Sequence, residues 1–129
     1  MTKPKIGILL STTRQSRFAD RPANWLLELA QGRDDADYEL VDLRDYAIPF
    51  FDSPASPRFV PVEDAAALRF ARRMAALDGV IFITAEYNHS MSAVLKNALD
   101  HLYDELARKP AAFVGYGAVG GARAVEHRG

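Results

Sequence analysis

The sequence predicts an open, doubly wound α/β sheet formed by a single domain over residues 1–129. Short apolar runs alternate along the chain with helical patterns, in the order β-α-β-α-β-α-β-α. Three of these runs are nearly continuous, as in parallel strands that are buried on both faces. Such sheets have right-handed crossovers and bind ligands at the carboxyl ends of the strands, where the strand order reverses.

The expected strands are short apolar runs bounded by turn residues. The second run alternates apolar residues with Glu39 and Asp42, which suits a strand nearer the solvent, whereas the others are apolar almost throughout. A strand is expected at each of residues 6–10, 38–43, 79–84 and 111–116.

Helical periodicity fills the intervals between the strands. Pro22 lies in the first turn of the first expected helix and Gly32 just beyond its end, which are the usual positions for these residues. The second helix has one apolar stripe along its length, and Ser90 is the expected N-cap of the third. The expected ranges are 20–31, 62–77, 91–106 and a fourth helix that begins near residue 120.

One long irregular stretch, residues 44–61, separates the second strand from the second helix and is rich in proline. A connection this long is usually functional or interfacial. Its Phe50-Phe51 pair suits a surface for a partner chain, and it equally suits a pair that folds back onto its own core.

Composition excludes several classes of protein. The chain has 16 Lys plus Arg against 17 Asp plus Glu, so its formal net charge is -1 and no overall basic field attracts nucleic acid. It has no cysteine, which excludes disulfides, zinc–thiolate sites and a cysteine nucleophile and suits a reducing compartment. No apolar run reaches the roughly 18 residues of a membrane helix, and no signal peptide is recognised. We therefore expect a cytoplasmic protein that binds neither nucleic acid nor membrane.

The loop after the first strand, residues 11–17 (STTRQSR), is rich in hydroxyls and guanidiniums. It precedes a helix whose free N–H groups and dipole favour an anion. Hydroxyls and N–H groups can donate to phosphate oxygens, and Arg14 or Arg17 can add charge and bidentate geometry. A solvated polar turn explains the same residues, so this loop alone leaves both interpretations open.

Other phosphate-binding motifs are excluded at this loop. It contains neither the glycines of a Rossmann fingerprint nor the Gly-Lys-Ser or Gly-Lys-Thr of a Walker loop. A literal GxGxxG does occur at Gly115, Gly117 and Gly120, but the acidic ribose ligand expected ~20 residues further on does not occur in the sequence. These glycines still allow a flat or anionic group to approach the backbone closely.

The loop after the third strand, residues 85–90 (AEYNHS), is the richest in polar chemistry. Tyr87 offers an aromatic face, and Asn88 offers both a donor and an acceptor. Together they suit the edge of a planar heterocycle better than a metal ion. His89 and His101 lack a partner at metal-ligand spacing, so surface or capping roles are preferred for both and no metal is expected.

Three segments of the sequence resemble the NADPH-dependent FMN reductase family. KIGILL followed by STTRQSR is similar to the family's first phosphate-binding loop, and AEYNHS followed by LKNALDHL is similar to its PEYN loop and succeeding helix. GYGAVGGARAVEH is similar to its SYG-x-x-GG-x-RA-x-EH segment. The three matches occur in the family's order and cover almost the whole chain, and the second is quite specific.

The resemblance implies a flavodoxin-like fold, non-covalently bound FMN, and an enzyme that passes electrons from NADPH or NADH to a quinone, a flavin, an azo dye or a similar acceptor in a ping-pong cycle. It also implies a homodimer or homotetramer. The flavin carries the chemistry, so no catalytic residue of the protein is expected. Two alternatives remain open: an FMN-binding electron-transfer module without NAD(P)H oxidation, and a truncated subunit that no longer binds the cofactor.

Carried over position by position, the resemblance assigns Thr12, Arg14 and Arg17 to the FMN phosphate, with Ser11 and Thr13 lining the turn. The isoalloxazine ring is implied to lie between two further groups of residues. One side would be lined by Glu86, Tyr87, Asn88 and Ser90, and the other by Tyr116, Gly117 and Gly120.

The sequence departs from the family at Ser11, Ala85 and Gly115, where Gly, Pro and Ser are usual, so weaker or altered FMN binding is expected. Glu86 is expected to point into loop or subunit contacts, because a carboxylate beside reduced flavin would oppose its charge. The family fold also ends with a fifth strand and a last helix. The sequence is expected to lack the roughly 35–45 residues that form them, and to be less stable than a complete homologue.

Overall fold

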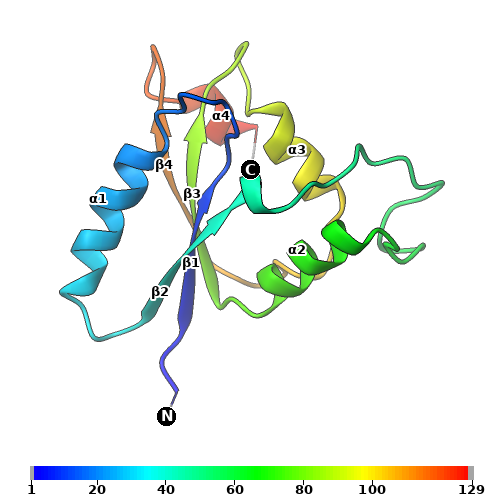
Figure 1. Ribbon diagram of the computed structural model, residues 1–129, viewed down its shortest axis with the longest axis horizontal. Helices are drawn as coiled ribbons and strands as arrows, with labels where there is room; N and C mark the ends of the chain where they lie inside the picture. Colours follow the sequence, from blue (N-terminus) through cyan, green and yellow to red (C-terminus); the bar gives the residue numbers. More distant parts are fainter. Residues whose placement is uncertain (1, 128–129) are drawn as a thin grey trace.

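The computed structural model describes residues 2–127, which form a parallel sheet with helices on both faces (Figure 1). The strands are β1 (Lys5–Leu10), β2 (Asp37–Asp42), β3 (Gly79–Ala85) and β4 (Ala111–Tyr116). The helices are α1 (Asp20–Gln31), α2 (Ala65–Ala75), α3 (Ala93–Asp100) and α4 (Ala122–Glu126), and a short 3-10 turn, η1 (Leu43–Asp45), follows β2.

The strand order is β2-β1-β3-β4, and every pairing is parallel. Ile8 in β1 lies opposite Leu40 of β2 on one side and Ile81 of β3 on the other. The chain thus moves outward from β1 to β2 and then crosses back to β3 and β4. This order confirms the doubly wound, flavodoxin-like α/β fold expected from the sequence, and it places the reversal of strand order between β1 and β3.

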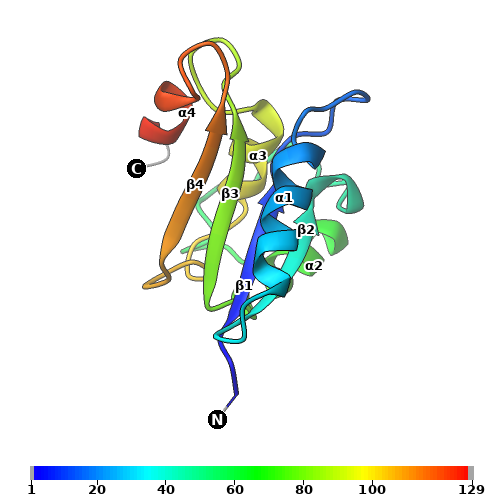
Figure 2. The same ribbon diagram turned by 90° about the vertical axis from the view of Figure 1, so that its left-hand side faces the viewer.

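Two apolar layers hold the sheet. Helix α1 covers one face, and α2 and α3 cover the other (Figure 2). Successive strand residues point to opposite faces, so Leu9 and Phe82 pack towards α2 and α3, whereas Ile8 and Ile83 pack towards α1. Burying each of these side chains stabilises the fold by about 2 kcal/mol. Packing on both faces therefore holds the strands in place, and with them the strand ends from which the loops begin.

Helix α1 spans the range expected from the sequence, whereas α2 and α3 begin later than expected. The Asp64 carboxylate caps α2 by accepting a hydrogen bond from the Ala67 N–H at 2.9 Å, so the helix starts after residue 64 rather than at 62. Ser92, and not Ser90, caps α3 by accepting from the Leu95 N–H at 3.2 Å. Side-chain acceptors close to the expected starts set both boundaries.

Helix α3 also ends at Asp100, before the residue 106 that its apolar spacing indicates. Leu102 and Leu106 still pack against the core that α3 covers, although they lie beyond the helix. The apolar spacing therefore predicts their contact with the core correctly, but it is wrong in predicting a helix through residue 106.

Candidate functional site

Three loops meet at the carboxyl edge of the sheet (Figure 1). We refer to them as the β1 loop (residues 11–19), the β3 loop (86–92) and the β4 loop (117–121). Together with Tyr116 at the end of β4, they carry every residue that the sequence assigns to a cofactor. The edge at which they meet is the one where a doubly wound sheet binds ligands.

Direct contacts join the β1 loop, the β3 loop and the end of β4 to one another. The Arg14 guanidinium lies over the Tyr87 ring, 5.7 Å from its centroid, and connects the β1 and β3 loops. The rings of Phe18 and Tyr116 pack edge to face with centroids 5.0 Å apart, which connects the β1 loop to β4. The Glu86 N–H donates to the Tyr116 carbonyl at 3.2 Å. The candidate residues therefore form one site rather than three separate turns.

Ser11 supports this site from inside the protein. Its side chain is fully buried, its hydroxyl donates to the Ile83 carbonyl, and its own carbonyl accepts from the Ser92 hydroxyl at 2.6 Å. Ser92 also caps α3, so one serine pair joins β1, β3 and the start of α3. The Ser11 hydroxyl is thus committed to the scaffold instead of facing a ligand.

Arg17 has a structural role that differs from the phosphate contact expected for it. Its side chain is only 4% exposed. It donates to the Thr12 carbonyl at 2.8 Å, to both carboxylate oxygens of Asp42 at 2.7 and 2.6 Å, and twice to Asp20 at 3.1 and 2.8 Å. A guanidinium has five N–H donors, and these bonds use all of them. In this arrangement every N–H of the Arg17 guanidinium has a protein partner, and a phosphate contact for Arg17 stays a prediction.

Arg14 is the arginine of the β1 loop that remains available. Both Arg14 and Thr13 are exposed. Among residues 2–127, the Arg14 guanidinium takes part in no ion pair. The carbonyl of Arg14 accepts a hydrogen bond from the Arg44 guanidinium, which fixes the backbone, while the Arg14 guanidinium lies over the Tyr87 ring. Of the two arginines of this loop, Arg14 is therefore the one whose charge is not already paired with a carboxylate.

Three buried hydroxyls have no hydrogen-bond partner among the described residues: Thr12 Oγ1 in the β1 loop, Tyr116 Oη at the end of β4, and Thr84 Oγ1 within β3. Burial raises the pKa of the Tyr116 phenol, and the neighbouring Thr12 hydroxyl offsets part of this rise, although the two groups lie outside hydrogen-bond geometry. Orphaned buried hydroxyls are uncommon in folded proteins. Thr12 and Tyr116 lie at the meeting point of the loops, where a ligand oxygen would complete their hydrogen bonding.

The β3 loop is a tight turn. Tyr87 and Ser90 exchange backbone hydrogen bonds of 2.9 and 3.0 Å, and Asn88 and His89 between them have φ values of 48° and 68°. Two successive positive φ values are typical of a type I′ turn. Beside this turn lies a pocket of about 540 Å³. It is lined by Tyr87, Asn88, Ser90, Met91, Ala93, Lys96 and His127.

Glu86 points away from this pocket into the β4 side of the site. Its side chain is 6% exposed and pairs with Arg123, with Nη2 and Oε2 at 2.7 Å. The hydrogen bond from Arg123 is the main reason that the pKa of the Glu86 carboxyl lies below its ordinary value. The sequence predicts loop or subunit contacts for this carboxylate, and its partner Arg123 lies in the first turn of α4.

The β4 loop brings its backbone close to Glu86. A side chain added at Gly117, which has a φ of 144°, would place its Cβ 3.3 Å from the Glu86 Cβ. A Cβ added at Gly120 would have no neighbouring atom within 4 Å. The loop thus approaches the β3 loop closely at one glycine and leaves room for a ligand at another.

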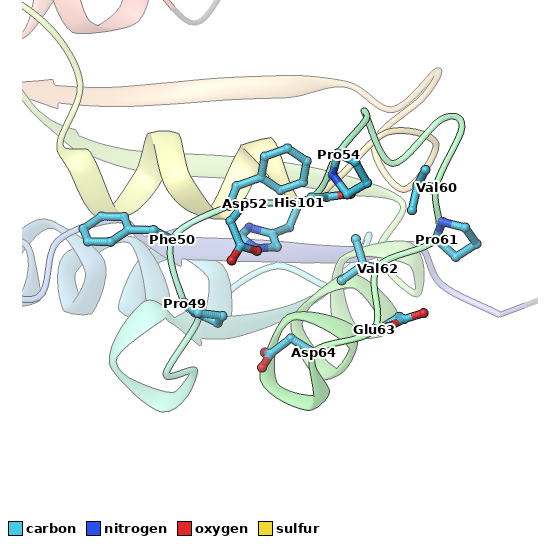
Figure 3. Close-up of a pocket in the computed structure, with 12 residues that line it drawn as sticks. Pro49, Phe50, Asp52, Pro54, Val60, Pro61, Val62, Glu63, Asp64 and His101 are labelled. Carbon is cyan, nitrogen blue, oxygen red and sulfur yellow. The ribbon is translucent and has the colours of Figure 1, made fainter.

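A second hollow, of about 420 Å³, lies away from these loops (Figure 3). The connection between η1 and α2 surrounds it, and His101 reaches it from the end of α3. The Phe51 ring packs edge-on against the His101 ring with centroids 5.1 Å apart, whereas Phe50 is 83% exposed. The two phenylalanines thus separate: one folds back onto the protein, and the other faces solvent.

Sequence reasoning missed three residues that hold the site together: Asp42, Ser92 and Arg123. Asp42 ends β2 and pairs with Arg17, and Ser92 caps α3. Arg123 lies in the RA pair of the last resembling segment. The position of Asp42 at the carboxyl end of a strand was a usable signal, because such ends meet at one edge of a parallel sheet.

Within residues 2–127, no helix has the length and apolar character needed to cross a membrane. The same residues bring together no group of three His, Cys, Asp or Glu side chains that could hold a metal ion.

The sequence matches the family model described as NADPH-dependent FMN reductase over residues 4–128. An NAD(P)H-dependent FMN reductase of Schizosaccharomyces pombe is 37% identical over 120 residues, which cover 92% of this chain and 60% of that protein. A 2-hydroxy-1,4-benzoquinone reductase of a Burkholderia species is 32% identical over 130 residues, which cover 95% of this chain and 67% of that protein. The chain thus spans 60% of the length of the yeast relative.

A solved structure gives the same result for the fold. The flavoenzyme FerB of Paracoccus denitrificans, an NAD(P)H:(acceptor) oxidoreductase, superimposes with a TM-score of 0.76 at 26% sequence identity. The superposition covers 97% of this chain and 68% of FerB.

Proposed function

The chain belongs to the NADPH-dependent FMN reductase family, and from that premise we propose that it binds FMN without a covalent link and passes electrons from NADPH or NADH to a small-molecule acceptor. A quinone, a flavin and an azo compound are acceptors of the appropriate class. The observation that carries the proposal is the meeting of three loops around orphaned hydroxyls and an unpaired arginine at the switch point of the sheet.

The β1 loop would hold the FMN phosphate. Thr12, Thr13 and Arg14 supply hydroxyl donors and one positive charge, and the N-terminus of α1 adds its dipole. The unsatisfied Thr12 hydroxyl fits this ligand, because a phosphate oxygen is a strong acceptor. Ser11 and Arg17 would act beneath it by fixing the loop to β3 and β2.

The β3 and β4 loops would hold the isoalloxazine ring. Tyr87, Asn88 and Ser90 line the open pocket on one side, and Tyr116, Gly117 and Gly120 would lie on the other. FMN, when bound, supplies the hydride chemistry, so the residues of this chain have the tasks of orienting the ring and leaving one face open to the two substrates. Glu86 would act through its contact with Arg123.

The first experiment is a titration of the purified protein with FMN, followed by NADPH or NADH without oxygen. We expect the fluorescence of FMN to be quenched on binding, and the yellow absorbance to disappear when the nicotinamide is added. Unquenched FMN would overturn the proposed function. Bound FMN that neither nicotinamide reduces would instead favour a flavin-binding electron-transfer module.

Replacing Thr12 by valine is expected to change FMN binding and stability in opposite directions. Valine has nearly the shape of threonine but no hydroxyl, so it removes a buried polar atom that has no partner. Without FMN, the free energy of unfolding should rise by about 1 kcal/mol. The Kd for FMN should increase about tenfold, because a hydrogen bond to the phosphate is lost. Denaturant unfolding and fluorescence titration measure the two quantities.

Thr84→Val is the matched control for this prediction. Thr84 is also fully buried and its hydroxyl also lacks a partner, but it lies within β3 instead of a loop. The control should raise stability to a similar extent while leaving the Kd for FMN unchanged. Equal effects of the two variants on FMN binding would argue against a phosphate contact at Thr12.

We also propose that the protein forms a homodimer or homotetramer in the cytoplasm, where NAD(P)H is available. Exposed aromatic side chains support a contact between copies: Phe50 is 83%, Phe59 71% and Tyr103 48% exposed. The Arg58 guanidinium lies over both the Phe59 and Tyr103 rings, which groups these two into one patch. Sedimentation of the purified chain measures its oligomeric state, and a monomer at all concentrations would contradict this part of the proposal.

A further inference from the structure

Arg123 and Glu86 form the main contact between the β4 side of the site and the β3 loop. The two oxygens of the Glu86 carboxylate accept hydrogen bonds from Nε and Nη2 of Arg123 at 3.1 and 2.7 Å, and the Arg123 backbone N–H adds a third at 3.0 Å. The Glu86 side chain is 6% exposed, whereas that of Arg123 is 39% exposed. The contact is therefore a nearly buried carboxylate neutralised by one guanidinium.

The same guanidinium also reaches the tight turn of the β3 loop. Nη1 of Arg123 lies 2.8 Å from Nδ1 of His89, a residue with a φ of 68°. A left-handed backbone is costly for a residue other than glycine and persists only when its surroundings hold it. Arg123 thus joins the carboxylate at the end of β3 to the turn that carries Tyr87 and Asn88.

We propose that Arg123 is a positioning residue that cancels the charge of Glu86 beside the flavin. This inference rests on the proposed FMN site. Bound FMN would accept a hydride, which is two electrons and one proton, from NAD(P)H; NAD(P)⁺ would leave, and the FMN site would hold one more negative charge. An unpaired carboxylate next to the ring would repel that charge, and Arg123 removes the repulsion. The pair would therefore set how much more tightly the site binds reduced FMN than oxidised FMN.

The test is the midpoint potential of bound FMN in variants that alter charge in opposite directions. Arg123→Gln exposes the negative charge of Glu86, and we expect reduced FMN to bind about tenfold more weakly relative to oxidised FMN, a decrease of about 30 mV for a two-electron couple. Glu86→Gln leaves Arg123 unpaired, and the potential should rise by a similar amount. The double variant, which combines Arg123→Gln with Glu86→Gln, should have a midpoint potential close to that of the unaltered protein. The same is expected for Arg123→Lys, which keeps the positive charge.

Arg33→Gln is the matched control, because it removes the guanidinium of an exposed ion pair, with Asp35, that lies outside the three loops. Its potential should not change. A purely structural role for Arg123 predicts that Glu86→Gln and Arg123→Gln move the potential in the same direction and that the double variant is no better than either, and this result would overturn the inference.

Two further results separate a failure of the proposed function from a failure of this inference. If the unaltered protein binds no FMN, the proposed function fails and the inference fails with it. If FMN binds with the same potential in all variants, the proposed function stands and the inference alone is overturned. Should Arg123→Gln fail to fold, Glu86→Gln and Arg123→Lys still decide the matter, because an unchanged potential in Glu86→Gln contradicts the proposed charge balance.

Discussion

Replacement of Asp42 by alanine is expected to lower the free energy of unfolding by about 2 to 3 kcal/mol, because it leaves the Arg17 guanidinium buried without its main partner. Asp42 receives two of the five hydrogen bonds that Arg17 donates, at 2.7 and 2.6 Å. The Arg17 side chain is 4% exposed and that of Asp42 25%, so water replaces these bonds only in part. Asp20 remains as a second partner but is half exposed, which keeps the expected loss below that for a fully isolated charge.

The same ion pair predicts a dependence on pH. Burial alone would raise the pKa of the Asp42 carboxyl, but hydrogen bonds from Arg17 and from the Arg44 N–H outweigh burial and hold the pKa below its ordinary value. The stabilisation is therefore fully present above the pKa of the unfolded chain, about 3.9, and is lost as the pH falls through the lower pKa of the folded protein. The difference between the unaltered protein and Asp42→Ala should shrink below about pH 4.

Denaturant unfolding at neutral and acidic pH measures this prediction, and Asp35→Ala is its control. Asp35 forms an ion pair of the same 2.6 Å length with Arg33, but both side chains are more than half exposed. Exposed pairs contribute little because water screens them. We therefore expect no measurable change in the control at neutral pH. Equal losses in the two variants would show that burial of Arg17 does not matter.

The fold could be predicted from the sequence because local patterns determine it. Nearly continuous apolar runs indicate strands buried on both faces, and right-handed crossovers leave few ways of connecting them. These rules give the doubly wound class, and helical periodicity gives the full extent of α1. The order β2-β1-β3-β4 agrees with the flavodoxin-like fold that the family resemblance implied. The end of α3 could not be predicted in this way, because Leu102 and Leu106 are partly buried against the core without being helical.

The candidate site could be located from the sequence, but the individual roles within it could not. Arg14 and Arg17 lie in the same seven-residue loop and have the same side chain. Only Arg17 meets Asp42, which is 25 positions further along the chain, and this contact decides which guanidinium is free. A sequence pattern identifies which groups can bind a phosphate, whereas tertiary partners determine which of them are already occupied.

Replacement of Gly121 by alanine is expected to have the other large effect, a loss of about 3 kcal/mol in the free energy of unfolding and weaker FMN binding. Gly121 has a φ of 74°, and a Cβ there would lie 2.9 Å from the Tyr116 nitrogen and 3.0 Å from the Gly115 Cα. These are backbone atoms that cannot rotate away, so the β4 loop must move. That movement would displace Tyr116 and the start of α4, from which Arg123 reaches Glu86.

Gly120→Ala separates the cost of the backbone conformation from the cost of the close contact. Gly120 has nearly the same φ, 69°, but an added Cβ would meet nothing within 4 Å. Alanine there should cost only about 1 kcal/mol, from left-handed strain alone. Unfolding of the two variants, measured side by side without FMN, gives the contribution of the contact as their difference. The two glycines have nearly the same φ but different surroundings. Equal losses of unfolding free energy in Gly120→Ala and Gly121→Ala would therefore mean that the close packing of the β4 loop against the end of β4 contributes nothing to stability.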